Sequence, residues 1–156
     1  KLVSSGNTIE YPIEALKFLK IIANKINKFG GGLLTFDYGH TRKKNKNTLQ
    51  SIQKHKYFDL FFEPGHSDIT SHLNFKLFRE ILIKYNLDVK KIISQGNFLK
   101  KIGILERANI LSKKMTFKEK ANMFYRLKRL IDHNEMGKHF KVLFAQKKSK
   151  IFSLGF

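Results

Sequence analysis

The short apolar run at residues 33–36 constrains the fold of this chain more than any other segment. It lacks the alternating polar residues of a half-exposed strand, so it predicts a parallel strand at 32–37 that is buried on both faces. Residues 12–28 place apolar side chains at three- and four-residue steps, which predicts an amphipathic helix that ends at Gly30. A helix followed by a buried strand is typical of the α/β class.

Further elements follow along the chain. We expect a helix from Asn74 to about Tyr85, with Phe78, Ile81, Leu82 and Tyr85 inward, and then a strand at 89–94. Helical structure at 97–113 is interrupted by Gly103, and a strand at the edge of the sheet is expected at 139–146. Between them, a helix from Thr116 to Ile131 begins with a capping box and keeps five apolar side chains largely on one side: Phe117, Ala121, Phe124, Leu127 and Leu130. Three strands are too few for a complete doubly wound sheet, so the natural interpretation is half of one.

Residues 41–67 show no regular pattern, and they include the charged stretch 42–47 and an aromatic-rich stretch at 56–65. A connection of this length in a compact domain is usually functional, so we expect an ordered excursion. For its apolar side chains, Phe58, Leu60, Phe61 and Phe62, we favour core packing over a platform that stacks a ligand.

Composition narrows the possible functions. The chain has 156 residues, which suits one domain, and no cysteine, which excludes disulfides and thiolate chemistry. No apolar run approaches the roughly 20 residues that span a bilayer. A formal charge of +19 is compatible with nucleic-acid binding, but the lysine pairs are spread along the whole sequence and biased composition explains them as well. A basic module that binds single-stranded nucleic acid is therefore the less favoured alternative.

Several short motifs occur in a fixed order. They are Asp37-Tyr38-Gly39, Thr48-Leu49-Gln50, His55, Pro64-Gly65, Asp68 with Thr70 and His72, Gln95-Gly96 with Phe98-Leu99, and Met136-Gly137 before Phe140-Lys141-Val142. In order and spacing this series resembles the carboxyl-terminal half of the MidA family of class I S-adenosylmethionine-dependent methyltransferases. That family includes an arginine methyltransferase linked to assembly of mitochondrial complex I.

The resemblance implies a fold and a domain organisation. It implies an α/β fold that forms the carboxyl-terminal half of a Rossmann-like class I methyltransferase sheet, with strands five to seven and additional helices. Residues 32–37 would be the fifth strand, 89–94 the sixth and 139–146 the antiparallel seventh. Residues 1–156 would then be a partial methyltransferase domain from which the amino-terminal cofactor-binding half is absent, and we expect this fragment to be inactive alone.

The resemblance also implies a function. The full-length protein is expected to be an S-adenosylmethionine-dependent protein arginine methyltransferase, with the cofactor bound mainly by the missing half. The expected partner is a protein substrate, with a respiratory complex I subunit as the candidate, and no membrane insertion is expected. Such a protein would act in the bacterial cytoplasm or the mitochondrial matrix. A non-catalytic assembly factor that keeps the fold is a further alternative.

Candidate site residues follow from the same motifs. Methyl transfer requires alignment of donor and nucleophile, and a guanidinium acceptor calls for carboxylates that bind it and help to remove a proton. Asp37 is the first candidate because it is expected at the carboxyl end of a buried strand, where α/β sheets place ligands; capping of the next turn explains it equally well. Asp68 and His72 are the other catalytic candidates, although a helix-entry network is the simpler explanation of this segment. The residues expected to line the site are Tyr38, Gly39, Thr70, Gln95 and Gly96.

A metal site is not expected. Four histidines, His40, His55, His66 and His72, accompany Asp37 and Asp68, but their separations match no compact ligand motif.

Overall fold

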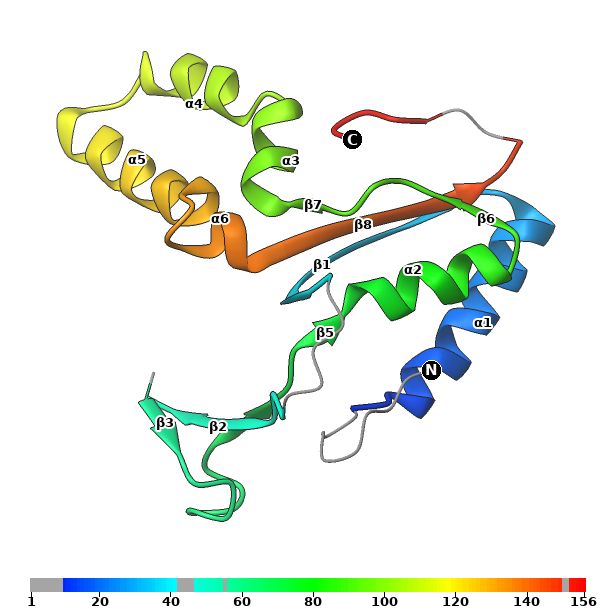
Figure 1. Ribbon diagram of the computed structural model, residues 1–156. Helices are drawn as coiled ribbons and strands as arrows, with labels where there is room; N and C mark the ends of the chain where they lie inside the picture. The colour runs from blue at the N-terminus through cyan, green and yellow to red at the C-terminus, as the bar shows by residue number, and fades with distance from the viewer. Residues whose placement is uncertain (1–9, 42–46, 55, 150–151) are drawn as a thin grey trace.

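A mixed sheet forms the centre of the computed structural model, which describes residues 10–41, 47–54, 56–149 and 152–156. Its strand order is β5 (Leu73–Asn74), β1 (Gly32–His40), β8 (Phe140–Lys147) and β6 (Leu87–Val89), and β7 (Ile93–Ser94) also pairs with β8. A smaller sheet has the order β3 (Lys56–Phe58), β2 (Gln50–Gln53) and β4 (Asp68–Thr70). Figure 1 shows the smaller sheet beyond β5, away from the helices that flank β8.

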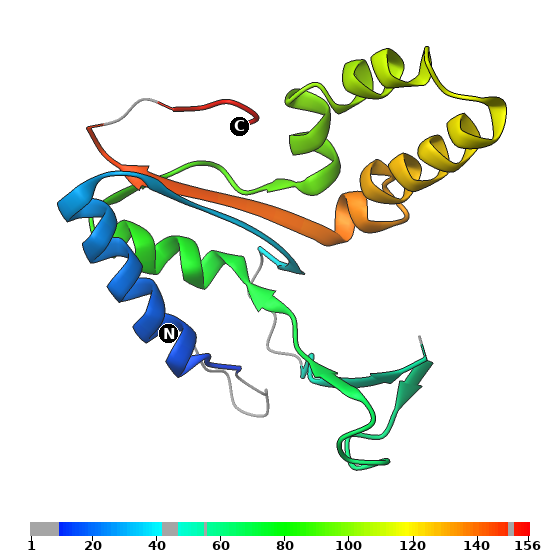
Figure 2. The ribbon, with the colours of Figure 1, turned by 180° about the vertical axis from the view of Figure 1, so that it is seen from behind.

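Six helices are described: α1 (Ile13–Phe29), α2 (Phe75–Lys84), α3 (Gln95–Lys101), α4 (Ile104–Ser112), α5 (Phe117–Ile131) and α6 (Met136–His139). In Figures 1 and 2, α1 and α2 lie on one face of the central sheet. The pair α4 and α5 extends away from the sheet, so that the turn between them lies at one end of the molecule. Within the part of the chain that the structure describes, no helix is long and apolar enough to cross a bilayer.

Strand β8 has neighbours on both of its edges. It is antiparallel to β1 over seven residue pairs, from Gly32 with Gln146 to Tyr38 with Phe140, and antiparallel to β6 and β7 on its other edge. Residues 142–146 are all buried. The expectation of an edge strand at 139–146 was therefore wrong, because the short strands β6 and β7 supply a second partner.

Burial of β1 differs between its two faces. Leu33 packs against the core formed with α1 and α2, whereas Leu34 and Phe36, on the opposite face, are 47% and 40% exposed. That face is covered only in part, by an edge-to-face contact of Phe36 with Phe98 and by the carboxyl-terminal segment near Phe144. The expectation of a parallel strand buried on both faces was therefore wrong: among the described residues β1 is parallel to β5 over two residue pairs and antiparallel to β8 over seven, and one of its faces is half open.

The core lies between the central sheet and the first two helices. Its fully or nearly fully buried members include Leu19 and Ala23 of α1, Phe75 and Leu82 of α2, and Leu143 of β8. Asn74 caps α2 because its side chain accepts a hydrogen bond from the Leu77 amide. The predicted helix from Asn74 to Tyr85 is confirmed, and so is the inward position of its apolar side chains.

Helix boundaries later in the chain also follow the sequence. Gly103 separates α3 from α4 in a left-handed conformation at φ 86°, and Thr116 forms the predicted capping box with Glu119. The single strand predicted at 89–94 was wrong: β6 ends at Val89 and β7 covers only Ile93–Ser94. Lys90 between them donates its amide to the Phe144 carbonyl at 2.9 Å.

The five apolar side chains expected largely on one side of α5 differ in burial, and the expected core packing of the aromatic side chains in the excursion was wrong. On α5, only Leu127 is buried, whereas Phe117, Ala121 and Phe124 are exposed. In the excursion, Phe61 is 85% exposed and Phe62 stacks on Phe58 at 5.0 Å. The excursion is the small sheet β3-β2-β4, which stands apart from the core, so its aromatic residues do not fill that core.

Two glycines bring α3, α5 and α6 into close contact. A Cβ at Gly96 would lie 2.6 Å from the Ile131 carbonyl oxygen, and one at Gly137 would overlap with the backbone of Ile131 and Asp132. Only glycine fits at these two positions, and the end of α5 is thereby held against α3 and α6.

Asp88 connects β6 to the end of β8 and gives a pH-dependent prediction. Hydrogen bonds from Lys90 at 2.9 Å and from Gln146 at 3.1 Å lower the pKa of the Asp88 carboxyl below its usual value of 3.8. Because the folded state favours the carboxylate, these hydrogen bonds stabilise the folded state at pH values above the unfolded pKa. This stabilisation is lost as the pH falls through the lowered folded pKa. We expect Asp88→Asn to lower the thermal midpoint at pH 7, and the difference from the parent chain to shrink below about pH 4.

Glu135→Gln is the matched control, because Glu135 is exposed and its side chain makes no capping hydrogen bond to α6. Thermal unfolding followed by circular dichroism between pH 2.5 and 7 measures both variants. A constant difference between Asp88→Asn and the parent chain across that range would contradict the linkage.

Candidate functional site

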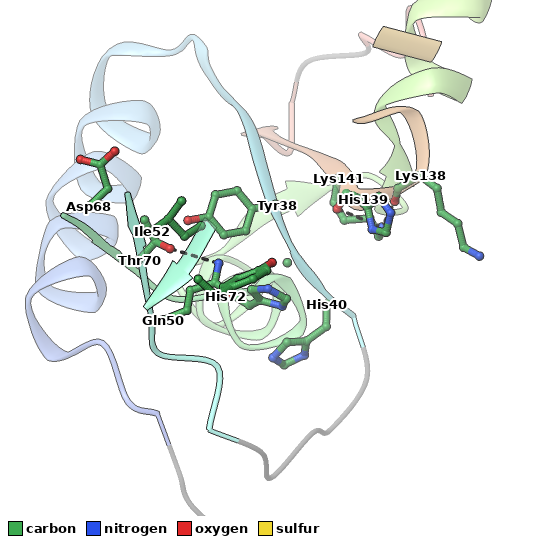
Figure 3. Close-up of a pocket in the computed structure, with 12 residues that line it drawn as sticks. Tyr38, His40, Gln50, Ile52, Asp68, Thr70, His72, Lys138, His139 and Lys141 are labelled. Carbon is green, nitrogen blue, oxygen red and sulfur yellow. Dashed lines mark hydrogen bonds between the residues drawn. The ribbon is translucent and has the colours of Figure 1, made fainter. Parts of the chain in front are cut away.

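A pocket of about 690 Å³ lies where the carboxyl end of β1 meets the small sheet and α6. This volume is within the range of ligand sites in proteins. Twelve residues line it: Tyr38, Gly39, His40, Gln50, Ile52, Tyr57, Asp68, Thr70, His72, Lys138, His139 and Lys141. Figure 3 shows that the group around Tyr38 and His72 comes from β1 and the excursion, whereas His139 and Lys141 face it from α6 and β8.

The geometry at Gly39 determines how β1 reaches the pocket. A Cβ on Gly39 would overlap with the Leu73 carbonyl, because β1 and β5 approach closely where they pair in parallel. Only glycine allows this approach, and β5 therefore pairs with Gly39 and His40, directly after Tyr38.

Aromatic and polar contacts fix the interior of the pocket. The Tyr38 ring meets the rings of His72 and Phe140 edge to face, with centroids 5.6 Å and 5.8 Å apart. Gln50 donates its side-chain amide to the Thr70 hydroxyl at 3.2 Å, so that β2 and β4 present these two side chains together. The interior is therefore assembled from segments far apart in the sequence.

A hydrogen-bond network joins the excursion to the segment before α1. The Glu10 carboxylate accepts from both the amide and the hydroxyl of Thr48, each at 2.6 Å. The Thr48 hydroxyl accepts in turn from the His72 amide at 2.9 Å. Glu10 and Thr48 thereby hold His72 at the mouth of the pocket.

The α6 side of the pocket is basic. Lys141 donates its ammonium to the carbonyls of Lys138 and His139 at the end of α6. Partial burial, and secondarily the charge of Lys138, lower the pKa of Lys141 below its usual value. In Figure 3 the Lys138 side chain extends away from the pocket, so Lys141 is the nearer cation.

Five of the eight site residues predicted from sequence line this pocket: Tyr38, Gly39, Asp68, Thr70 and His72. Asp68 is exposed, and Figure 3 shows it apart from the group around Tyr38. Asp68 is also the single carboxylate among the twelve lining residues.

Three predicted residues lie outside the lining. Asp37 is half-buried in β1, three residues before the end of the strand, and its carboxylate accepts from the Tyr38 amide at 2.8 Å. It stands opposite Lys141 in the strand register. Gln95 and Gly96 begin α3, where Gln95 donates to the Leu130 carbonyl at 2.9 Å and Gly96 packs on Ile131. The contacts of these last two residues connect helices.

The sequence prediction missed seven lining residues: His40, Gln50, Ile52, Tyr57, Lys138, His139 and Lys141. Gln50 and Lys141 belong to the ordered motifs, so the sequence could have indicated them as lining residues. Tyr57 and His139 lie outside those motifs. Tyr57 reaches the pocket through the pairing of β3 with β2, whereas His139 is the last residue of α6, directly before β8. No group of three metal-ligating side chains converges among the described residues, and His55 lies outside them.

Comparison with known proteins identifies the family. A family profile of S-adenosyl-L-methionine-dependent methyltransferases matches residues 1–93. The chain belongs to this family. It is 27% identical over 144 residues to the mitochondrial protein arginine methyltransferase NDUFAF7 of Xenopus tropicalis, which covers 92% of the chain and 33% of that protein. It is 33% identical over 95 residues to the NDUFAF7 homologue of Drosophila melanogaster, covering 60% of the chain and 22% of that protein.

Solved structures agree with this assignment. A Burkholderia thailandensis protein crystallised with S-adenosyl-homocysteine is 26% identical to this methyltransferase-family chain and superimposes with a TM-score of 0.75. The match covers 93% of the chain and 38% of that structure. The chain spans about one third of the length of the curated relatives it matches.

The network around Thr48 predicts the behaviour of the excursion. In Thr48→Val the shape is retained, but Glu10 loses one donor and the His72 amide loses its acceptor, at a cost of about 1–3 kcal/mol. We expect faster amide hydrogen exchange in residues 47–73 and unchanged exchange in α2.

Thr41→Val is the control, because Thr41 is exposed and lies just beyond the end of β1. Mass-spectrometric hydrogen exchange on the three proteins makes the comparison. Equal exchange in residues 47–73 of Thr48→Val and Thr41→Val would rule out the stabilising role of this network.

Proposed function

We propose that this chain is the carboxyl-terminal part of an S-adenosyl-L-methionine-dependent protein arginine methyltransferase and supplies its acceptor side. One observation carries the proposal: β8 lies between β1 and β6 and is antiparallel to both. The MidA resemblance implies a sheet with a fifth, a sixth and an antiparallel seventh strand. In this proposal β1 is the fifth strand, β6 the sixth and β8 the seventh.

The open edge of β1 supports the same proposal. Residues 32–38 pair with β8 on one edge, and within the described ranges no strand pairs with their other edge. An unpaired edge beside half-exposed apolar side chains such as Leu34 is a site for another strand. We propose that the amino-terminal half of the methyltransferase sheet joins there, with residues 1–156 as the partial domain.

The described residues do not fit the whole cofactor. In a dinucleotide-type sheet a glycine-rich turn at the carboxyl end of a strand lets the backbone approach the ligand. Here the glycine run 30–32 lies at the amino end of β1, and the pocket lies at the opposite end. Gly39, which is at the pocket, is required by the contact with Leu73. We therefore assign cofactor binding mainly to the upstream half.

The pocket supplies groups for a guanidinium acceptor. S-adenosyl-L-methionine, when bound, supplies the methyl group. In our proposal the Asp68 carboxylate at the rim attracts the guanidinium, the Tyr38 ring positions it and His72 accepts a proton. Asp37, three residues before the end of the same strand, is the second proposed carboxylate.

The acceptor is proposed to be a protein. The names of the relatives support a protein arginine as the methylated group, and they support a mitochondrial place of action, with the matrix as the proposed compartment. A respiratory complex I subunit is the substrate that we propose from the MidA resemblance.

Cofactor binding tests the domain assignment. We expect no calorimetric binding of S-adenosyl-L-methionine by residues 1–156, and micromolar binding when the reading frame is extended upstream, because the extension adds the missing half of the sheet. S-adenosyl-homocysteine is the positive comparison and ATP the negative one. Binding by residues 1–156 that matches the extended protein would overturn the assignment.

The acceptor assignment is tested separately on the extended protein. We expect Asp68→Asn to lower kcat/KM for the protein substrate by about 10²-fold and to leave cofactor affinity unchanged, because Asp68 contacts only the acceptor in this proposal. Asp59→Asn, an exposed acid in the same excursion, should keep full activity. Equal rates for Asp68→Asn and Asp59→Asn would remove Asp68 from the mechanism.

A further inference from the structure

The turn between α4 and α5 combines exposed apolar side chains with a dense positive charge. Residues 100–131 contain ten lysines and arginines and two glutamates. Lys113 and Lys114 form the turn itself, and Phe117, 88% exposed, follows at the first position of α5. Figures 1 and 2 show this turn at one end of the molecule, far from the central sheet.

Helix α5 has two apolar faces, and only one of them is covered. Leu127 is buried, and Met123, Leu130 and Ile131 beside it are half-buried, which forms the inner face. Phe117, Ala121 and Phe124 recur at steps of four and three residues and therefore share another face. All three are exposed, and Tyr125 beside them is 65% exposed.

Four of the five cations of α5 lie in or beside this outer face, and Arg126 lies on the opposite side of the helix. At 100° per residue, Lys118 and Arg129 border the side next to Tyr125, and Lys128 lies within the stripe at its far end. Glu119 falls on the opposite side of the helix, where it closes the capping box with Thr116. An aromatic stripe bordered by cations, with the acid turned away, is the pattern of a helix that lies in the headgroup region of a bilayer.

Other occupants fit this face less well. A second copy of the chain would bring the same cations against each other, and repulsion opposes that contact. Single-stranded nucleic acid binds in positively charged grooves that follow its backbone, whereas this face belongs to a projecting helical pair. Ile110 and Leu111, exposed in the last turn of α4 just before Lys113, add aliphatic side chains that suit acyl chains better than bases.

We propose that the α4–α5 turn and the outer face of α5 form a peripheral docking surface for an anionic lipid bilayer. Phe117, Phe124 and Tyr125 enter the headgroup region, where aromatic rings are favoured, and Lys113, Lys114 and Lys118 contact the anionic headgroups. The turn lies at the opposite end of α5 from α6, which lines the pocket, so docking leaves the pocket open to a protein substrate. The proposal does not depend on the methyltransferase activity.

A single tryptophan reports contact with lipid, because the chain has none of its own. In Phe117→Trp we expect the emission maximum to shift to the blue by about 10 nm on addition of vesicles of phosphatidylcholine with 30% phosphatidylglycerol. Phe61→Trp is the matched control: Phe61 is 85% exposed but stands between the acids Asp59 and Glu63. A shift of the same size at both positions, or at neither, would overturn the proposal.

Vesicle flotation tests the cations. We expect Lys113→Gln with Lys114→Gln to weaken binding to the anionic vesicles at least fivefold, while the control pair Lys20→Gln with Lys25→Gln, exposed on α1, changes it less than twofold. Binding should also fall between 50 and 300 mM NaCl and be absent with pure phosphatidylcholine.

Three outcomes would overturn the docking surface. The first is an equal loss of vesicle binding in the two double-lysine variants, and the second is equal binding of the chain to neutral and anionic vesicles. The third is binding of a single-stranded oligonucleotide that depends on Phe117, without binding of vesicles. The last outcome would assign this face to nucleic acid. Circular dichroism of each variant confirms that the helices are intact.

Discussion

The pairing of β8 with β1 is the interaction on which the rest of the structure depends. Seven residue pairs join these strands, and the buried segment 142–146 provides the surface on which the other elements pack. Helices α1 and α2 cover one face of this ribbon through Leu143 and Ala145, and the carboxyl-terminal aromatics cover part of the other through Phe144. Without this central pair, neither β6 nor the helices would have a surface to pack against.

The same pairing creates the pocket. It places Tyr38 opposite Phe140 and Asp37 opposite Lys141, so that the end of β1 meets the residues that follow α6. Gly137 and Gly96 hold α6 close to the end of α5, which determines where His139 and Lys141 lie. A basic wall from α6 thereby faces an aromatic and polar wall from β1 and the excursion. Asp68 at the rim gives this pocket its carboxylate.

Two of the exposed surfaces in the described part of the chain differ in their chemistry. The edge of β1 exposes unpaired backbone beside Leu34 and Phe36, which calls for another strand. The outer face of α5 exposes aromatic rings among lysines and arginines. Because the backbone groups of α5 are hydrogen-bonded within the helix, this face suits contact with another surface and not pairing with a strand. The first surface belongs to our proposal for the methyltransferase sheet, and the second to the proposed lipid contact.

Local signals in the sequence determined most element boundaries. Asn74, Thr116 with Glu119, and Gly103 act through their own backbones and nearest neighbours, so the ends of α2, α3, α4 and α5 could be predicted from them. The ordered motifs also identified the family and five lining residues of the pocket. These features depend on residues close together in the chain or on their fixed order.

Tertiary structure alone decided the rest. Whether 139–146 is an edge or an interior strand depends on whether another strand pairs with it, and that information lies about 50 residues upstream in β6 and β7. Which apolar face of α5 is covered depends on α3 and α6, so Phe117 and Leu127 cannot be distinguished by periodicity. Tyr57 enters the pocket through strand pairing, and His139 enters it from the end of α6. Pairing between distant segments leaves no local pattern in the sequence. The sequence therefore predicted the helices and strands better than it predicted which of them pack together.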